Sequence, residues 1–88
     1  MADSFSDNAA RGRFELEVVG QVAFANYKRT KDALAILHVE TPAALRGTGV
    51  ASRLMENIVA TAKSEGIGVV PYCSYAADWM RRRNGASR

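Results

Sequence analysis

Two glycines and a threonine stand close together in this chain of 88 residues, in the segment Arg46-Gly47-Thr48-Gly49-Val50-Ala51. Glycine lets the backbone turn tightly and brings several N–H groups close to an anion. If a helix begins at this turn, its dipole also favours negative charge there. A diphosphate is therefore the expected ligand. The segment is not a P-loop, because the Gly-Lys-Ser/Thr ending is missing, and it is not a dinucleotide fingerprint, which requires Gly-x-Gly-x-x-Gly.

His38 and Glu40 are candidates for proton transfer. They stand two residues apart in an apolar, strand-like segment, so their α-carbons are about 7 Å apart on one face. Either side chain could act as a base, directly or through a water molecule. The structural alternatives are a partly buried histidine satisfied by the backbone, and a solvated carboxylate at a strand end that pairs with Arg46 or Arg53.

Cys73 is the third candidate for a catalytic residue. It could carry an acyl group if the N-terminus of a following helix favours its thiolate. The alternative is a small buried thiol beside the ligand. Tyr72 and Tyr75 could donate a proton to a leaving thiolate, or could serve packing. A lone His38 and a lone Cys73 cannot supply zinc-type ligation, so no metal site is expected.

The elements that position these residues begin with three expected strands. Residues 1–12 are polar and small, and are expected to form a flexible leader. A strand then starts at Arg13, where apolar residues alternate with glutamates, and a second strand covers residues 22–27. The third strand covers residues 33–40. Its alternation places Leu34, Ile36, His38 and Glu40 on one face and Ala35, Leu37 and Val39 on the other.

A helix is expected over residues 50–65, since its apolar residues recur at helical spacing. Residues 67–70 form a short buried strand, and the strand–helix–strand unit should be a right-handed crossover. A last helix over 74–83 has Ser74 as its N-cap, and 84–88 form a flexible tail. The predicted fold is α/β (α+β), with a mostly antiparallel sheet of four strands, a βαβ crossover and two helices.

Composition restricts the class of protein. The chain is 48% hydrophobic and 24% charged, as expected of one small globular domain, and its apolar runs fall short of the roughly 18 residues of a membrane span. A single cysteine excludes an internal disulfide and fits the reducing cytoplasm.

The net charge is +3, with arginines crowded at residues 81–83 and 88. These could attract nucleic acid or a phosphorylated cofactor, or form a solvated helix end. No aromatic pattern for base stacking supports nucleic acid.

The glycine segment resembles the signature of the GNAT acetyltransferase superfamily, Gln/Arg-x-x-Gly-x-Gly/Ala, with Arg46, Gly49 and Ala51 at the defining positions. The chain is more similar still to a short, single-domain branch of N-acetyltransferase domain-containing proteins. The shared residues are His38-Val39-Glu40-Thr41-Pro42 before the loop and Val70-Pro71-Tyr72-Cys73-Ser74-Tyr75 after the helix. The resemblance covers about residues 14–83, so a minimal GNAT-like domain is expected over 13–83.

The resemblance implies an acetyl-CoA site. The amides of residues 46–51 would cradle the coenzyme A pyrophosphate, and the pantetheine arm would lie between strands 33–40 and 67–71. The thiol end would point toward His38, Glu40 and Cys73. The residues expected to bind the cofactor are Val39, Leu45, Arg46, Gly47, Thr48, Gly49, Val50, Ala51, Cys73, Ser74 and Tyr75.

Two functions follow from this resemblance. The first is an acetyl-CoA-dependent N-acetyltransferase that acts on an amine of a small molecule or peptide by direct transfer. The second is a coenzyme A-binding regulatory or interaction module with little catalysis. The second arises because the helices before the sheet and the later strands, which wall the acceptor site in most members, are absent or minimal here. An open sheet edge on so small a core would favour a homodimer.

Overall fold

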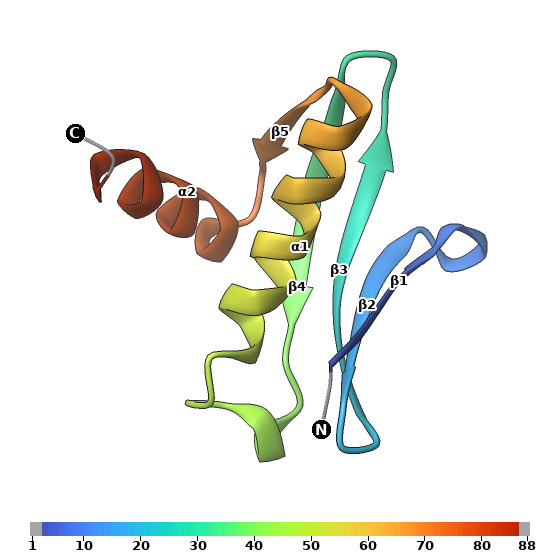
Figure 1. The fold of residues 1–88 in the computed structure, drawn as a ribbon, viewed down its shortest axis with the longest axis vertical. Coiled ribbons are helices and arrows are strands. Elements are labelled where there is room, and N and C mark those ends of the chain that lie inside the picture. The colour runs from blue at the N-terminus through green and yellow to red at the C-terminus, as the bar shows by residue number, and fades with distance from the viewer. Residues whose placement is uncertain (1–2, 87–88) are drawn as a thin grey trace.

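Five strands and two helices form the part of the chain described by the computed structural model, residues 3–86 (Figure 1). The elements are β1 (Ser4–Asn8), the 3-10 helix η1 (Ala9–Arg11), β2 (Arg13–Val18), β3 (Gln21–Arg29), β4 (Ala33–Glu40), the 3-10 helix η2 (Ala43–Leu45), α1 (Val50–Glu65), β5 (Gly68–Pro71) and α2 (Ser74–Ala86). The strands lie in chain order across one sheet, antiparallel from β1 to β4, with β5 parallel to β4. The expected α/β class, crossover and two helices are confirmed.

The sheet has five strands, whereas the sequence led us to expect four. The additional strand, β1, lies within the segment expected to be a flexible leader, and it pairs with β2 along its whole length. Its sequence is mostly polar because it is an edge strand with little to bury. Only Phe5 packs on the core, where its ring stacks 5.6 Å from that of Phe14. Asp7 accepts hydrogen bonds from Tyr27 and Arg29, so polar contacts also hold the strand.

The hairpin between β2 and β3 is closed by two residues. Val19 and Gly20 both have positive φ, at 50° and 76°, which is the geometry that matches the twist of a tight hairpin. Glycine adopts it readily, whereas valine does so at a cost in strain. The next turn is fixed differently, since the hydroxyl group of Thr30 accepts the N–H of Ala33.

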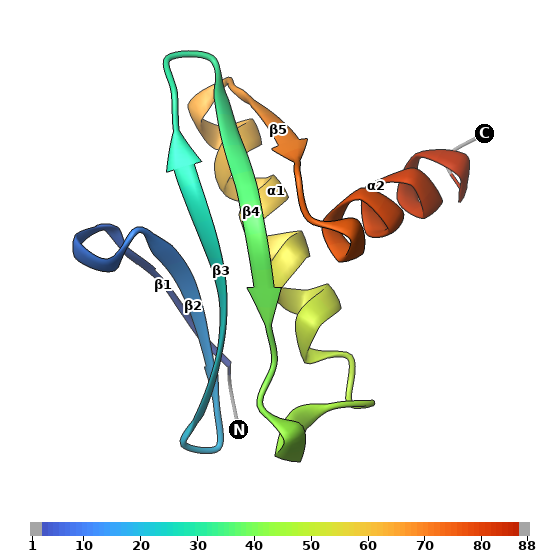
Figure 2. The ribbon, with the colours of Figure 1, turned by 180° about the vertical axis from the view of Figure 1, so that it is seen from behind.

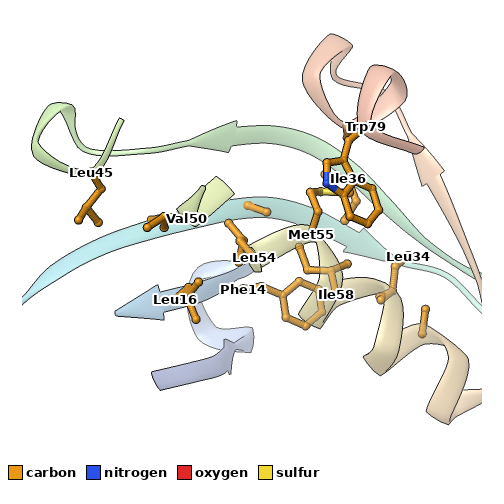
Figure 3. Packing of buried hydrophobic residues seen from close by; sticks show 14 residues of the cluster. Phe14, Leu16, Leu34, Ile36, Leu45, Val50, Leu54, Met55, Ile58 and Trp79 are labelled. Carbon is orange, nitrogen blue, oxygen red and sulfur yellow. The ribbon is translucent and has the colours of Figure 1, made fainter. Parts of the chain in front are cut away.

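Helix α1 covers one face of the sheet, as Figures 1 and 2 show from opposite sides. It ends at Gly66, whose φ of 73° forms a left-handed cap. The core lies between this helix and the strands (Figure 3), and its members are Phe14, Leu16, Ala23, Ala25, Leu34, Ile36, Leu45, Val50, Leu54, Met55, Ile58, Ala62, Ala76 and Trp79. The two alanines of β3 are fully buried, so the helix approaches the middle of the sheet closely.

Helix α2 packs beside α1, and the indole ring of its Trp79 reaches the core next to Met55 and Ile36 (Figure 3). The indole N–H donates to the hydroxyl group of Ser52 on α1 at 2.8 Å. The helix continues to Ala86, beyond the expected end at residue 83, so the first three residues of the expected flexible tail are helical. Residues 87 and 88 of that tail lie outside the described residues, as do residues 1 and 2 of the expected leader. No helix within residues 3–86 has the length and apolar character needed to cross a membrane.

Candidate functional site

Strand β4 changes its surroundings halfway along its length. From Ala33 to Ile36 it pairs with both β3 and β5. The carbonyl of Ile36 then accepts the N–H groups of Tyr72 and Cys73, at 2.9 and 3.3 Å, and after this point the chain of β5 turns away into α2. Figure 2 shows the two strands separating there. The edge of β4 from Leu37 to Glu40 is therefore left without a neighbouring strand on this side.

A β-bulge marks the same point. Tyr27 pairs with Ile36 and the preceding Asn26 pairs with His38, so Leu37 has no partner on β3. An inserted residue reverses the side to which the following residues point. Leu34 and Ile36 face α1, but His38 and Glu40 face the other side of the sheet. The prediction that all four share one face is therefore wrong, because simple alternation does not foresee the inserted residue. Val39 takes the place facing α1 and packs on the core.

A cavity of about 470 Å³ opens where β4 has lost its neighbour. It is bounded by the end of β4, the loop that follows, the first turn of α1 and the first turn of α2. The residues that line it are Val39, Glu40, Thr41, Leu45, Arg46, Gly47, Gly49, Val50, Ala51, Ser52 and Tyr75. The wall contains both apolar and polar residues, so the cavity can receive an aliphatic chain as well as charged groups.

The glycine loop gives this cavity one end at which several backbone N–H groups are unpaired within the described residues. Gly47 and Gly49 have φ of 79° and 82°, which only glycine adopts without strain. Their N–H groups donate to no other group within the described residues, and the N–H groups of the first turn of α1 have no partner inside the helix. The first turn holds no acidic residue. Unpaired N–H groups and the positive end of the helix dipole therefore meet in one place.

Thr48 and Arg53 hold the loop rather than line the cavity. The hydroxyl group of Thr48 donates to the carbonyl of Leu45. The guanidinium of Arg53 donates to the Thr48 carbonyl at 3.2 Å and pairs with Asp3. The side chain of Arg46 donates from Nε to the Thr41 carbonyl at 3.4 Å. Two cations therefore border the loop, and their bonds fix its backbone.

His38 and Glu40 lie next to each other at the open end of β4. Nε2 of His38 is 2.7 Å from Oε1 of Glu40, and the two side chains are 57% and 47% exposed. Because a carboxylate only accepts hydrogen bonds, the imidazole donates from Nε2 when Glu40 is ionised. Glu40 lines the cavity, whereas His38 does not. The expected pairing of Glu40 with Arg46 or Arg53 is not found in the described residues.

Cys73 occupies the N-cap of α2. Its sulfur accepts the N–H of Ala76 at 3.3 Å, and its carbonyl accepts that of Ala77 at 3.0 Å. Ser74, predicted as the N-cap, is instead the first residue of the helix, because the chain enters the helix one residue earlier than a serine cap would require. The thiol packs partly buried against the core and does not line the cavity. Of the three reactive candidates, Glu40 lines the cavity, whereas His38 and Cys73 do not.

Tyr75 stands at the junction of two cavities. A second one, of about 450 Å³, shares Ser52 and Tyr75 with the first and is otherwise lined by Glu56, Trp79, Arg82 and Arg83. Burial raises the pKa of Tyr75, and the charge of Arg82 partly offsets this effect. The phenol therefore stays protonated at neutral pH and can act as a donor. The guanidinium of Arg83 lies over the ring of Trp79, 5.1 Å from its centre.

The structure and the sequence agree on most of the cavity wall. Of the residues expected to bind a cofactor, the cavity is lined by Val39, Leu45, Arg46, Gly47, Gly49, Val50, Ala51 and Tyr75, and is not lined by Thr48, Cys73 and Ser74. Thr41 and Ser52 were not among the expected residues. The helical period could have identified Ser52, since it lies in the first turn after Gly49. No group of three or more His, Cys, Asp or Glu side chains that could hold a metal ion occurs among residues 3–86.

Comparison with known families gives a match over most of the chain. The model of a family described as GCN5-related N-acetyl-transferase matches residues 13–87, which is most of the chain. No curated protein matches the sequence.

Proposed function

Since the chain belongs to the GCN5-related N-acetyltransferase family, whose members carry out acyl transfer, we propose that it transfers an acetyl group from acetyl-CoA to an amine. One observation carries this proposal. A single cavity is lined by the glycine loop, by the first turn of α1 and by the end of β4 with Glu40, beside the edge of β4 that β5 leaves open. A cofactor with a diphosphate at one end and a reactive thioester at the other needs such a cavity.

The residues present fit coenzyme A. The diphosphate would be held by the N–H groups of Gly47, Gly49 and the first turn of α1, with Arg46 nearby as a counter-charge. The amide-bearing pantetheine arm would lie along the edge of β4, where backbone groups have no strand partner. The second cavity would take the nucleotide end, since it offers the indole of Trp79 and the cations of α2 beside Tyr75. When bound, acetyl-CoA supplies a thioester that is open to attack by an amine.

The chain would supply two proton transfers. An amine is protonated at neutral pH, so it must lose a proton before it can attack. Glu40 would take this proton, because it is one of the residues at the cavity, and His38 would orient the carboxylate through the bond at 2.7 Å. Tyr75 would give its phenolic proton to the departing thiolate. The amine nitrogen forms the new amide bond as the carbon–sulfur bond breaks. Its second proton would restore the phenol of Tyr75, and the proton taken by Glu40 is released to solvent.

A second function is favoured by the exposure of this pair. The side chains of His38 and Glu40 are about half exposed, so water is not excluded from the base. A chain that binds coenzyme A and regulates or contacts another protein, with little catalysis, has the same cavity and needs no shielded base. Both functions share the cofactor and differ in turnover.

Mass spectrometry of the purified protein with acetyl-CoA separates these functions. Under native conditions we expect a protein peak with one bound coenzyme A. With a panel of primary amines added, we expect acetylated amines and free coenzyme A. A bound cofactor without any acetylated amine would establish the binding module. The absence of both a bound cofactor and acetylated products would refute the two functions together.

A further inference from the structure

Three of the most exposed large apolar side chains lie together at the border of β4 and β5. The exposed fractions are 48% for Leu37, 39% for Val70 and 71% for Tyr72. The fourth, Val19, is 71% exposed but stands alone at the tip of the β2–β3 hairpin. Single exposed apolar residues are common on protein surfaces, whereas a group of them marks a binding site more often.

Strand register places the three side chains on one face of the sheet. Val70 pairs with Ala35, which lies between two residues that face α1, so Val70 points to the uncovered side. Tyr72 is two residues further along, and its N–H bonds to the Ile36 carbonyl, which continues the ladder and places it beside Leu37. Leu37 is the bulge residue, next to His38. We call Leu37, Val70 and Tyr72 the apolar patch.

The apolar patch and Glu40 lie on the same face of the sheet. Leu37 and Glu40 are three positions apart along β4, which is a path of about 10 Å or slightly less along a bulged strand. Helix α1 closes the other face. An amine that gives its proton to Glu40 must therefore approach from the uncovered face, and the rest of its structure then lies over β4.

We propose that the apolar patch binds the hydrocarbon part of the acceptor, so that the substrate is a primary amine with an aromatic or aliphatic group. This inference rests on the proposed function. The ammonium group lies at Glu40 and the apolar group extends toward Leu37 and Tyr72. The surrounding charges favour this orientation, because Lys28 pairs with Ala35 and stands on the same face at the far end of the patch. A second ammonium group at that end would meet a like charge, so diamines are poor acceptors.

A matched pair of amines tests this inference. n-Hexylamine and cadaverine have similar length, but the far end of cadaverine carries a second charge. We expect kcat/KM for n-hexylamine to exceed that for cadaverine by about tenfold or more. In Leu37→Ser and Tyr72→Ser, KM for n-hexylamine should rise by about five- to tenfold through the loss of apolar contact, with kcat and coenzyme A affinity preserved.

Two controls and one further patch variant accompany these substitutions. Tyr72→Phe keeps the ring, so KM for n-hexylamine should rise far less than in Tyr72→Ser. Val19→Ser removes an equally exposed apolar side chain away from the patch and should change nothing. Val70→Ser tests the same contact without altering the bulge, in case Leu37→Ser unfolds.

The outcomes separate the two levels of the proposal. If the wild type acetylates no amine of the panel, the proposed function fails. If it acetylates other amines of the panel but neither of these two, only the apolar acceptor is refuted. If it acetylates both with equal kcat/KM, or if the patch variants leave KM for n-hexylamine unchanged, only the apolar acceptor is refuted. A wild-type dimer in sedimentation that Tyr72→Ser converts to a monomer, with KM unchanged, would assign the patch to a second copy of the chain and overturn the inference.

Discussion

The two halves of β4 have the same secondary structure and different surroundings. From Ala33 to Ile36 the strand pairs on both edges, and the side chains of Leu34 and Ile36 are fully buried under α1. From Leu37 to Glu40 it pairs only with β3, and the side chains of His38 and Glu40 reach solvent. One half of the strand supports the core, and the other half provides the edge and the carboxylate that the proposed chemistry requires.

The difference shows how a small domain can combine a core with an open site. A single inserted residue, Leu37, moves Glu40 to the face away from α1, and the departure of β5 opens the edge at the same place. Without the bulge, the carboxylate would point into an apolar core, where an unpaired charge is very costly. If the two halves differ in function as they do in structure, substitutions in the open half should affect turnover and substitutions in the buried half should affect stability.

The largest effect is expected at Glu40, in the open half. Glu40→Gln keeps the size of the side chain but cannot take a proton, so turnover should fall by roughly 10²–10⁴ while coenzyme A affinity stays nearly unchanged. His38→Gln should cost about tenfold, because the histidine only orients the carboxylate. Steady-state kinetics with a primary amine measures both. A larger loss in His38→Gln than in Glu40→Gln would make the histidine the base.

The next effect concerns the buried half. Ile36→Ala removes a fully buried side chain and should lower the free energy of unfolding by about 2–5 kcal/mol. The adjacent Leu37→Ala removes an exposed one and should change it by at most about 0.5 kcal/mol. Urea unfolding followed by circular dichroism compares the two. Equal losses in these neighbours would show that the boundary at the bulge has no energetic meaning.

A smaller effect is expected at Cys73, whose N–H bonds to the Ile36 carbonyl where the two halves of β4 meet. Cys73→Ala removes the acceptor for the Ala76 N–H and should cost about 1 kcal/mol of stability, whereas Cys73→Ser keeps an acceptor and should cost less. Turnover should stay within a few-fold of wild type in both, since we expect direct transfer. A trappable acetyl-Cys73 that passes its acetyl group to an amine at the turnover rate would contradict this.

The smallest effect concerns Glu15, on the uncovered face. Its hydrogen bond from Arg13 lowers the pKa of Glu15 below its ordinary value of 4.5, and a further bond from Asn8 adds to this effect. Because the pKa of Glu15 is lower in the folded state, its carboxylate stabilises the fold at a pH above the pKa of the unfolded chain. This stability is lost as the pH falls through the pKa of the folded state. Glu15→Gln should therefore lower the free energy of unfolding by less than about 1 kcal/mol at pH 7. The difference from the wild type should shrink in acid. A difference that grows as pH falls would mean that the pKa is raised.

Much of this arrangement is visible in the sequence. A glycine at a strand-to-helix turn indicates a positive φ, and Gly49 has one. The helical spacing of apolar residues over 50–65 locates the helix that packs on the sheet. Most of the residues that line the cavity belong to that turn and the first residues of the helix. These features are local, so composition and spacing are sufficient to predict them.

Other features depend on contacts between distant residues. The bulge at Leu37 is defined by the register with β3, which the strand's own alternation cannot reveal. Strand β1 has a polar sequence because it lies at an edge, so no apolar period marks it. Cys73 caps α2 because the chain enters the helix one residue before Ser74, a difference of one residue that pattern reading does not resolve.

Binding of coenzyme A to Gly49→Glu tests the central claim most directly. The new side chain would place bulk and a negative charge at the first turn of α1, so isothermal titration should show the affinity for coenzyme A falling by more than about 2 kcal/mol. Gly66→Glu is the matched control, because Gly66 has a similar φ of 73°, room for a side chain and a place at the other end of α1. We predict wild-type affinity for Gly66→Glu and a large loss for Gly49→Glu. Unchanged affinity in a folded Gly49→Glu protein would show that the diphosphate does not bind at this loop.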